Sequence, residues 1–90
     1  MRRATIGAAA AAKIMSLAGI PITYEKFRAG IIQGVFSEFA HVIDMRDPIT
    51  KRGNYEYIIF RKDLRDYLRK NCMDELSPAV ENLLSKEDTA

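Results

Sequence analysis

Residues 55–68, Tyr-Glu-Tyr-Ile-Ile-Phe-Arg-Lys-Asp-Leu-Arg-Asp-Tyr-Leu, carry the strongest structural signal in the chain. The first six are mostly β-branched and aromatic, which predicts a strand over 55–60. The spacing then becomes helical, because Leu64, Tyr67 and Leu68 place one apolar stripe on a helix whose other faces are charged. We therefore predict that the strand leads directly into a helix over 61–71.

The segment before this strand supplies a partner for it. Residues 39–45 include Phe39, Val42 and Ile43 and predict a second strand. Residues 46–54 between the two strands are polar and contain Pro48 and Gly53, a composition typical of a loop. Strand, loop and strand together predict a β-hairpin with a long basic tip.

A first helix is expected near the start of the chain. Thr5 is a suitable N-cap for a helix over residues 6–18, which are rich in alanine, the strongest helix former. The apolar stripe of this helix would consist of Ile6, Ala10, Ile14 and Leu17. Gly19 and Pro21 then predict its end.

A second helix is expected over residues 23–33. Thr23 is the predicted N-cap. Phe27 and Ile31 lie four residues apart and would both face the core. Gly30 lies inside this helix at a cost of about 1 kcal/mol relative to alanine.

The charge is distributed unevenly along the chain. Residues 1–72 carry 13 Lys and Arg against 7 Asp and Glu, whereas residues 73–90 carry 1 Lys against 5 Asp and Glu. A basic body is typical of proteins that bind polyanions. We therefore expect a basic functional domain followed by an acidic tail.

The acidic tail contains one further helix signal. Ser77-Pro78 has the signature of a helix start, with serine as N-cap and proline at the first helical position. The apolar residues of this short helix would be Val80, Leu83 and Leu84. They could supply a dimer contact or pack on their own domain.

The residue inventory argues against several classes of protein. Ninety residues suffice for one domain, and Cys72 as the sole cysteine excludes an intrachain disulfide. No segment approaches the roughly 20 apolar residues that span a bilayer. With His41 as the sole histidine, a structural zinc site is not available, and there is no glycine-rich phosphate loop. We expect a cytoplasmic, non-enzymatic protein that uses no cofactor, no metal and no membrane.

Four short motifs carry a resemblance to a known family. They are Ala11-Ala12-Lys13-Ile14-Met15, then Thr23 with Lys26-Phe27-Arg28, then Gln33-Gly34-Val35-Phe36, and the closing run from Phe60 to Leu68. With these motifs the segment from residue 5 to residue 70 resembles the excisionase-like winged helix-turn-helix family of phages and mobile elements, which is related to the MerR-type domain.

The resemblance implies a fold and a division of the chain. The fold class would be α+β and mostly helical, a winged helix-turn-helix with a two-stranded β-hairpin wing and a C-terminal helix. Residues 1–72 would form the winged helix-turn-helix domain, and residues 73–90 would form the acidic tail with its short helix. The helix over 23–33 would enter the major groove of DNA, which is wide enough for one helix.

The resemblance also implies which residues contact DNA. On the reading helix these are Thr23, Tyr24, Glu25, Arg28 and Gln33. Arg28 is the expected base contact, because arginine pairs with guanine edges through two hydrogen bonds. The wing would contribute Arg46, Lys51 and Arg52 on the neighbouring backbone or minor groove. Lys13, together with Arg2 and Arg3, would bind backbone phosphates.

Two readings of the function stay open at this point. The first is a sequence-specific DNA-binding protein, either an excisionase-type architectural factor or a small transcriptional regulator. Its partners would be double-stranded DNA, further copies of itself as a homodimer or cooperative multimer, and a recombinase or other protein. The alternative is a small phage-type inhibitor or adaptor that binds protein through the same fold, which the acidic tail favours.

Overall fold

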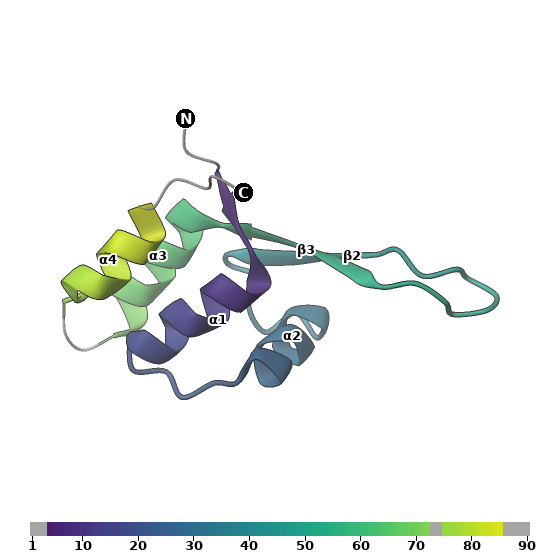
Figure 1. Cartoon of the computed structure of the whole chain (residues 1–90), viewed down its shortest axis with the longest axis horizontal. Helices are drawn as coiled ribbons and strands as arrows, with labels where there is room; N and C mark the ends of the chain where they lie inside the picture. The colour runs from purple at the N-terminus through teal and green to yellow at the C-terminus, as the bar shows by residue number, and fades with distance from the viewer. Residues whose placement is uncertain (1–3, 73–74, 86–90) are drawn as a thin grey trace.

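The computed structural model describes residues 4–72 and 75–85, so Arg2 and Arg3 lie outside it. Within these residues the chain is an α+β protein in which helices outweigh strands. The elements follow the order β1 (Thr5–Ile6), α1 (Ala8–Leu17), α2 (Tyr24–Ile32), β2 (Ala40–Asp44), β3 (Tyr55–Phe60), α3 (Arg61–Asn71) and α4 (Pro78–Ser85). Figure 1 shows the helices gathered at one end, with the hairpin of β2 and β3 projecting away from them.

The N-terminal segment begins with a strand where we predicted a helix. Thr5 and Ile6 form β1, whereas α1 begins at Ala8 with Gly7 as its N-cap, so the prediction that Thr5 caps a helix over 6–18 is wrong at its start. The register of β1 on β3 is Thr5 opposite Phe60 and Ile6 opposite Ile59. A free strand edge offers unpaired backbone groups to a partner, and the two β-branched residues suit an extended chain.

The sheet consequently has three strands among the described residues, in the order β1-β3-β2. Because β1 pairs only with the last two residues of β3, the rest of the hairpin is two-stranded, as predicted for strands 39–45 and 55–60. β2 spans Ala40–Asp44, slightly shorter than the predicted strand over 39–45, and β3 matches the predicted strand at 55–60. The predicted loop over 46–54 is confirmed.

The helices predicted over 23–33 and 61–71 are also confirmed. α2 begins at Tyr24, and the Oγ1 of its N-cap Thr23 accepts a hydrogen bond from the Lys26 amide at 3.2 Å. α2 ends at Ile32 with Gln33 as its C-cap, followed by Gly34 with a left-handed φ of 82° that suits glycine at a helix end. α3 covers Arg61–Asn71 and follows β3 without a linker.

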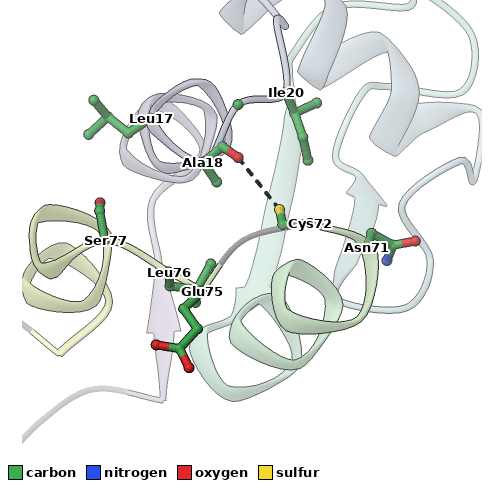
Figure 2. Close-up of a pocket in the computed structure, with 9 residues that line it drawn as sticks. Leu17, Ala18, Ile20, Asn71, Cys72, Glu75, Leu76 and Ser77 are labelled. Atoms are coloured by element: carbon green, nitrogen blue, oxygen red, sulfur yellow. Dashed lines mark hydrogen bonds between the residues drawn. The ribbon is translucent and has the colours of Figure 1, made fainter.

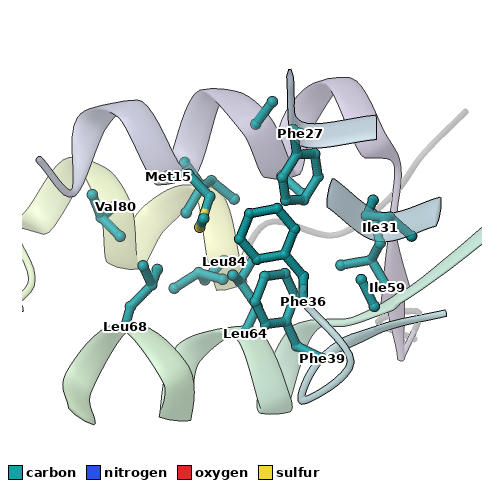
Figure 3. Close-up of a cluster of buried hydrophobic side chains, with 14 residues drawn as sticks. Met15, Phe27, Ile31, Phe36, Phe39, Ile59, Leu64, Leu68, Val80 and Leu84 are labelled. Atoms are coloured by element: carbon teal, nitrogen blue, oxygen red, sulfur yellow. The ribbon is translucent and has the colours of Figure 1, made fainter. Parts of the chain in front are cut away.

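The hydrophobic core draws on every helix and on the base of the hairpin (Figure 3). Phe27 and Ile31 of α2 are buried, as predicted. Phe27 packs against Phe36 and Phe39, which lie between α2 and β2, with ring centroids 5.2 and 6.2 Å away. This aromatic cluster anchors α2 against the start of the hairpin.

The helix of the acidic tail belongs to the same core. Val80 and Leu84 of α4 are completely or almost completely buried, and α4 packs against α1. Its Glu81 forms ion pairs with Arg65 and Arg69 of α3, both at 3.3 Å. Of the two roles predicted for this helix, packing on its own chain is the one observed, and the packing crosses the charge boundary at residue 72.

Candidate nucleic-acid interface

The outward face of α2 is organised around Arg28. Its guanidinium carbon lies 5.3 Å from the ring centre of Tyr24, one turn earlier on the same helix. Such a contact is attractive, because the negative face of an aromatic ring draws a cation. Tyr24 is 44% exposed and Arg28 is partly buried, so the pair is accessible on the surface of α2.

A second tyrosine connects Arg28 to the hairpin. The Nε of Arg28 donates a hydrogen bond to the Tyr57 hydroxyl on β3 at 3.2 Å, and its guanidinium lies 5.9 Å from the Tyr57 ring centre. The hydrogen bond that Arg28 donates to the Tyr57 hydroxyl is the main cause that raises the pKa of Arg28 above its ordinary value. Arg28 therefore stays charged and sits at the junction of α2 and the hairpin, two elements that are distant in sequence.

The other predicted residues of α2 have different surroundings. Thr23 is exposed, but its hydroxyl oxygen is occupied as the helix cap. Glu25 lies exposed in the first turn of α2, and Gln33 lies exposed at its end. Lys13 lies exposed midway along α1 and forms no ion pair with the described residues. Of the predicted DNA contacts, Tyr24 is therefore the one whose side chain contacts Arg28 in the described structure.

At the base of the wing, Arg46 is engaged within the protein. Two of its nitrogens donate hydrogen bonds to the Asp44 carboxylate, both at 3.0 Å, and its guanidinium lies 4.6 Å from the Tyr55 ring centre. The Arg46 hydrogen bonds lower the pKa of Asp44 to about 2. Arg46 is thus paired with Asp44 in the structure. To contact DNA as predicted, Arg46 would have to divide its hydrogen bonds between Asp44 and the DNA.

The wing tip is a tightly hydrogen-bonded turn. The Asp47 Oδ1 accepts hydrogen bonds from the backbone amides of Ile49 and Thr50, both at 2.8 Å. The Asp47 carbonyl accepts a third from the Lys51 amide at 2.9 Å. The Thr50 and Ile49 amide hydrogen bonds lower the pKa of Asp47. Lys51 and Arg52 are exposed on this turn, and neither forms an ion pair with the described residues.

Two tyrosines and one aspartate in this region were missed by our reading of the sequence. Tyr57 positions Arg28, Tyr55 stacks on Arg46, and Asp47 organises the tip. The alternation of side chains along a strand places residues 55 and 57 on one face, which was the available signal. No local sequence signal indicated the contact of Tyr57 with Arg28, because the two residues are 29 positions apart in the chain.

The residues that could support other chemistry lie apart from this surface. His41 is exposed on β2 with its ring edge against Phe60. Cys72 lines a pocket of about 520 Å³ between the end of α1 and the start of α4, where its Sγ donates to the Ala18 carbonyl at 3.5 Å (Figure 2). The described residues contain no group of three or more His, Cys, Asp and Glu that could hold a metal ion.

None of the described helices combines the length and hydrophobicity that a bilayer crossing requires. Comparisons with known protein families, with curated proteins and with solved structures each found no match.

Proposed function

We propose that this protein binds double-stranded DNA in a sequence-specific manner as a winged helix-turn-helix. In this proposal α1 and α2 are the helix-turn-helix pair, and α2 lies in the major groove. The wing over 46–54 lies on the adjacent backbone or minor groove. The order of two helices, a hairpin and a closing helix supports this assignment.

The arrangement of Arg28 is the observation that carries the proposal. Tyr57 holds the Nε, and no described residue accepts a hydrogen bond from the two terminal nitrogens. Those nitrogens have the spacing that pairs with the O6 and N7 atoms of guanine. An arginine fixed before binding loses less side-chain entropy when it binds. Arg28 is therefore suited to reading a base.

The charges of the wing support a backbone contact beside it. Lys51 and Arg52 are exposed and unpaired among the described residues, on a turn that is already ordered. Cations of this kind contact phosphates or enter narrow minor grooves. An excisionase-type architectural factor and a small transcriptional regulator both use such contacts. In either role the protein would act with further copies of itself or with a recombinase.

The alternative of a protein-binding inhibitor or adaptor finds no specific support. It relied on the acidic tail as a mimic of nucleic acid. In the described part of that tail, Glu81 turns inward and neutralises Arg65 and Arg69. This carboxylate is engaged within the fold, whereas Glu75, the other described acid of the tail, is exposed.

A salt titration tests the proposal. Fluorescence anisotropy would measure the Kd of the full chain for a mixed-sequence duplex and for duplexes selected from a randomised pool. We expect log K to fall with log salt by about 0.9 for each phosphate contact, and the selected duplexes to bind more tightly. No duplex affinity at low salt would refute DNA binding and leave the protein-binding alternative.

Two substitutions separate base contact from phosphate contact. Arg28→Ala is expected to weaken binding to the selected duplex by about 1–3 kcal/mol and to reduce the preference over mixed sequence. Lys51→Asn, which keeps a residue that tolerates the left-handed φ of 61° at this position, should weaken all duplexes alike. Lys62→Ala, an exposed lysine of α3, is the control. Equal losses on both duplexes for Arg28→Ala would contradict its reading role.

A further inference from the structure

The wing tip presents an unusually exposed isoleucine. Ile49 is 90% exposed, the highest value among the large exposed apolar residues of the described chain, while the next, Val35, is 63% exposed. Single exposed apolar residues are common on protein surfaces, so exposure alone does not indicate a binding function. Ile49 differs from the others in its position, because it lies midway between the end of β2 at Asp44 and the start of β3 at Tyr55. This connection belongs to the hairpin that projects from the helices (Figure 1).

The turn holds this isoleucine in a fixed position. Its own amide is bound to the Asp47 Oδ1 at 2.8 Å, and Pro48 before it has a restricted φ. Behind the turn, the Met45 amide donates to the Asn54 carbonyl at 3.0 Å. Gly53 is required there, since its φ is 112° and a Cβ would lie 2.9 Å from the Met45 carbonyl oxygen. The backbone is therefore ordered while the side chain projects into solvent.

The charges around Ile49 indicate the chemistry of its partner. Lys51 and Arg52 follow within three residues, exposed and without an ion pair among the described residues. The one acid of the tip, Asp47, directs its Oδ1 to backbone amides. An apolar side chain followed by two exposed cations fits a surface that is anionic outside and apolar within. The stacked bases of a DNA duplex below the phosphates are such a surface.

We propose that Ile49 is a wedge that enters the minor groove and partly unstacks one base step, so that the bound duplex is kinked. The proposal rests on the proposed DNA binding and adds a second action to it. Apolar side chains inserted between base pairs from the minor groove bend duplexes by about 20–90°. Lys51 and Arg52 would hold the phosphates on either side of the inserted side chain. The wing then deforms DNA while α2 reads it.

Ring closure of short DNA tests the wedge without knowledge of the target sequence. Fragments of about 120 base pairs are shorter than the persistence length of about 150 base pairs, so ligase circularises them slowly unless a protein bends them. Mixed-sequence fragments would be incubated at low salt with the full chain, with Ile49→Ala, with Ile49→Leu and with Leu17→Ala. Leu17, half exposed at the end of α1, is the matched apolar control. Anisotropy measures the Kd of each variant on the same DNA, and thermal unfolding verifies its fold.

We expect the unsubstituted chain, Ile49→Leu and Leu17→Ala to accelerate ring closure by about tenfold or more at saturation. Ile49→Ala should still bind, with Kd changed by less than about fivefold because the cations remain, but should lose most of the acceleration. Binding without acceleration by the unsubstituted chain, or undiminished acceleration by Ile49→Ala, would overturn the wedge and leave DNA binding intact. Absence of duplex binding at low salt would overturn both proposals.

Discussion

Gly30 shows how one residue of α2 is set by a distant ring. A Cβ built at this position would lie 2.5 Å from the Cε2 atom of Phe36. Phe36 is buried and packed against Phe27 and Phe39, so its ring has little space to withdraw. The glycine lowers the intrinsic helix propensity of α2, but it lets the Phe36 ring lie directly on the helix. Packing against Phe36 therefore requires glycine at position 30, although glycine is a poor helix former.

Gly30→Ala is expected to destabilise the protein although alanine favours helices. The gain in helix propensity is about 1 kcal/mol, and overpacking of a core typically costs about 1–3 kcal/mol. We expect a net loss of up to about 2 kcal/mol in the free energy of unfolding, measured by urea denaturation with circular dichroism. In a Phe36→Leu background, the same substitution should cost less. A stabilised Gly30→Ala protein would contradict the close packing.

At the scale of elements, the hairpin is more than a flexible loop between two strands. Its base is held by the Asp44–Arg46 pair and its tip by Asp47, both through carboxylates. Each carboxyl has a folded-state pKa below the ordinary 3.8, and that of Asp44 is about 2. The order of the wing therefore depends on two ionised acids that are largely exposed.

Acid should loosen the wing at a pH well below neutrality. Because the folded-state pKa values are depressed, the stabilisation is complete above about pH 5 and is lost as pH falls through the folded pKa. We expect the amide resonances of Ile49 and Thr50 to stay constant from pH 7 to pH 5 and to shift below about pH 4. The carboxyl carbon of Asp44 should titrate near 2 and, in Arg46→Ala, move up toward 3.8. An Asp44 midpoint at or above 3.8 in the unsubstituted protein would contradict the ion pair.

At the scale of the whole molecule, both ends of the described chain close the core. β1 completes the sheet on β3, and the Arg61 amide donates to the Ala4 carbonyl at 3.0 Å beside it. At the other end, α4 buries Val80 and Leu84 against the helices. A domain of this size has little stability in reserve. We therefore expect α4 to be needed for the stability of the surface that we propose to bind DNA.

Leu84→Ala measures that dependence. Removal of a buried leucine side chain costs about 2–5 kcal/mol, and we expect a loss in this range in urea denaturation with a single cooperative transition. Asn82→Ala, an exposed residue of the same helix, should change stability by less than about 0.5 kcal/mol. A loss below about 1 kcal/mol for Leu84→Ala would show that α4 does not support the core.

Local sequence determined the elements whose signals lie within a few residues. The strand at 55–60, the helix at 61–71 and the Thr23 cap of α2 follow from periodicity and capping, which neighbouring residues express on their own. The hairpin loop at 46–54 follows likewise from its polar residues, proline and glycine. The DNA contacts predicted on α2 and in the loop over 46–54 came from the sequence resemblance, and they stay predictions.

Tertiary structure decided what depends on residues far apart in the chain. Thr5 is extended because β3 has an edge to pair with 55 residues later, and α4 packs inward because α1 offers it an apolar face. The junction of Arg28 with Tyr57 arises in the same way. A local sequence pattern does not indicate such partners, because the interaction energy between two distant segments arises only after the fold has brought them together.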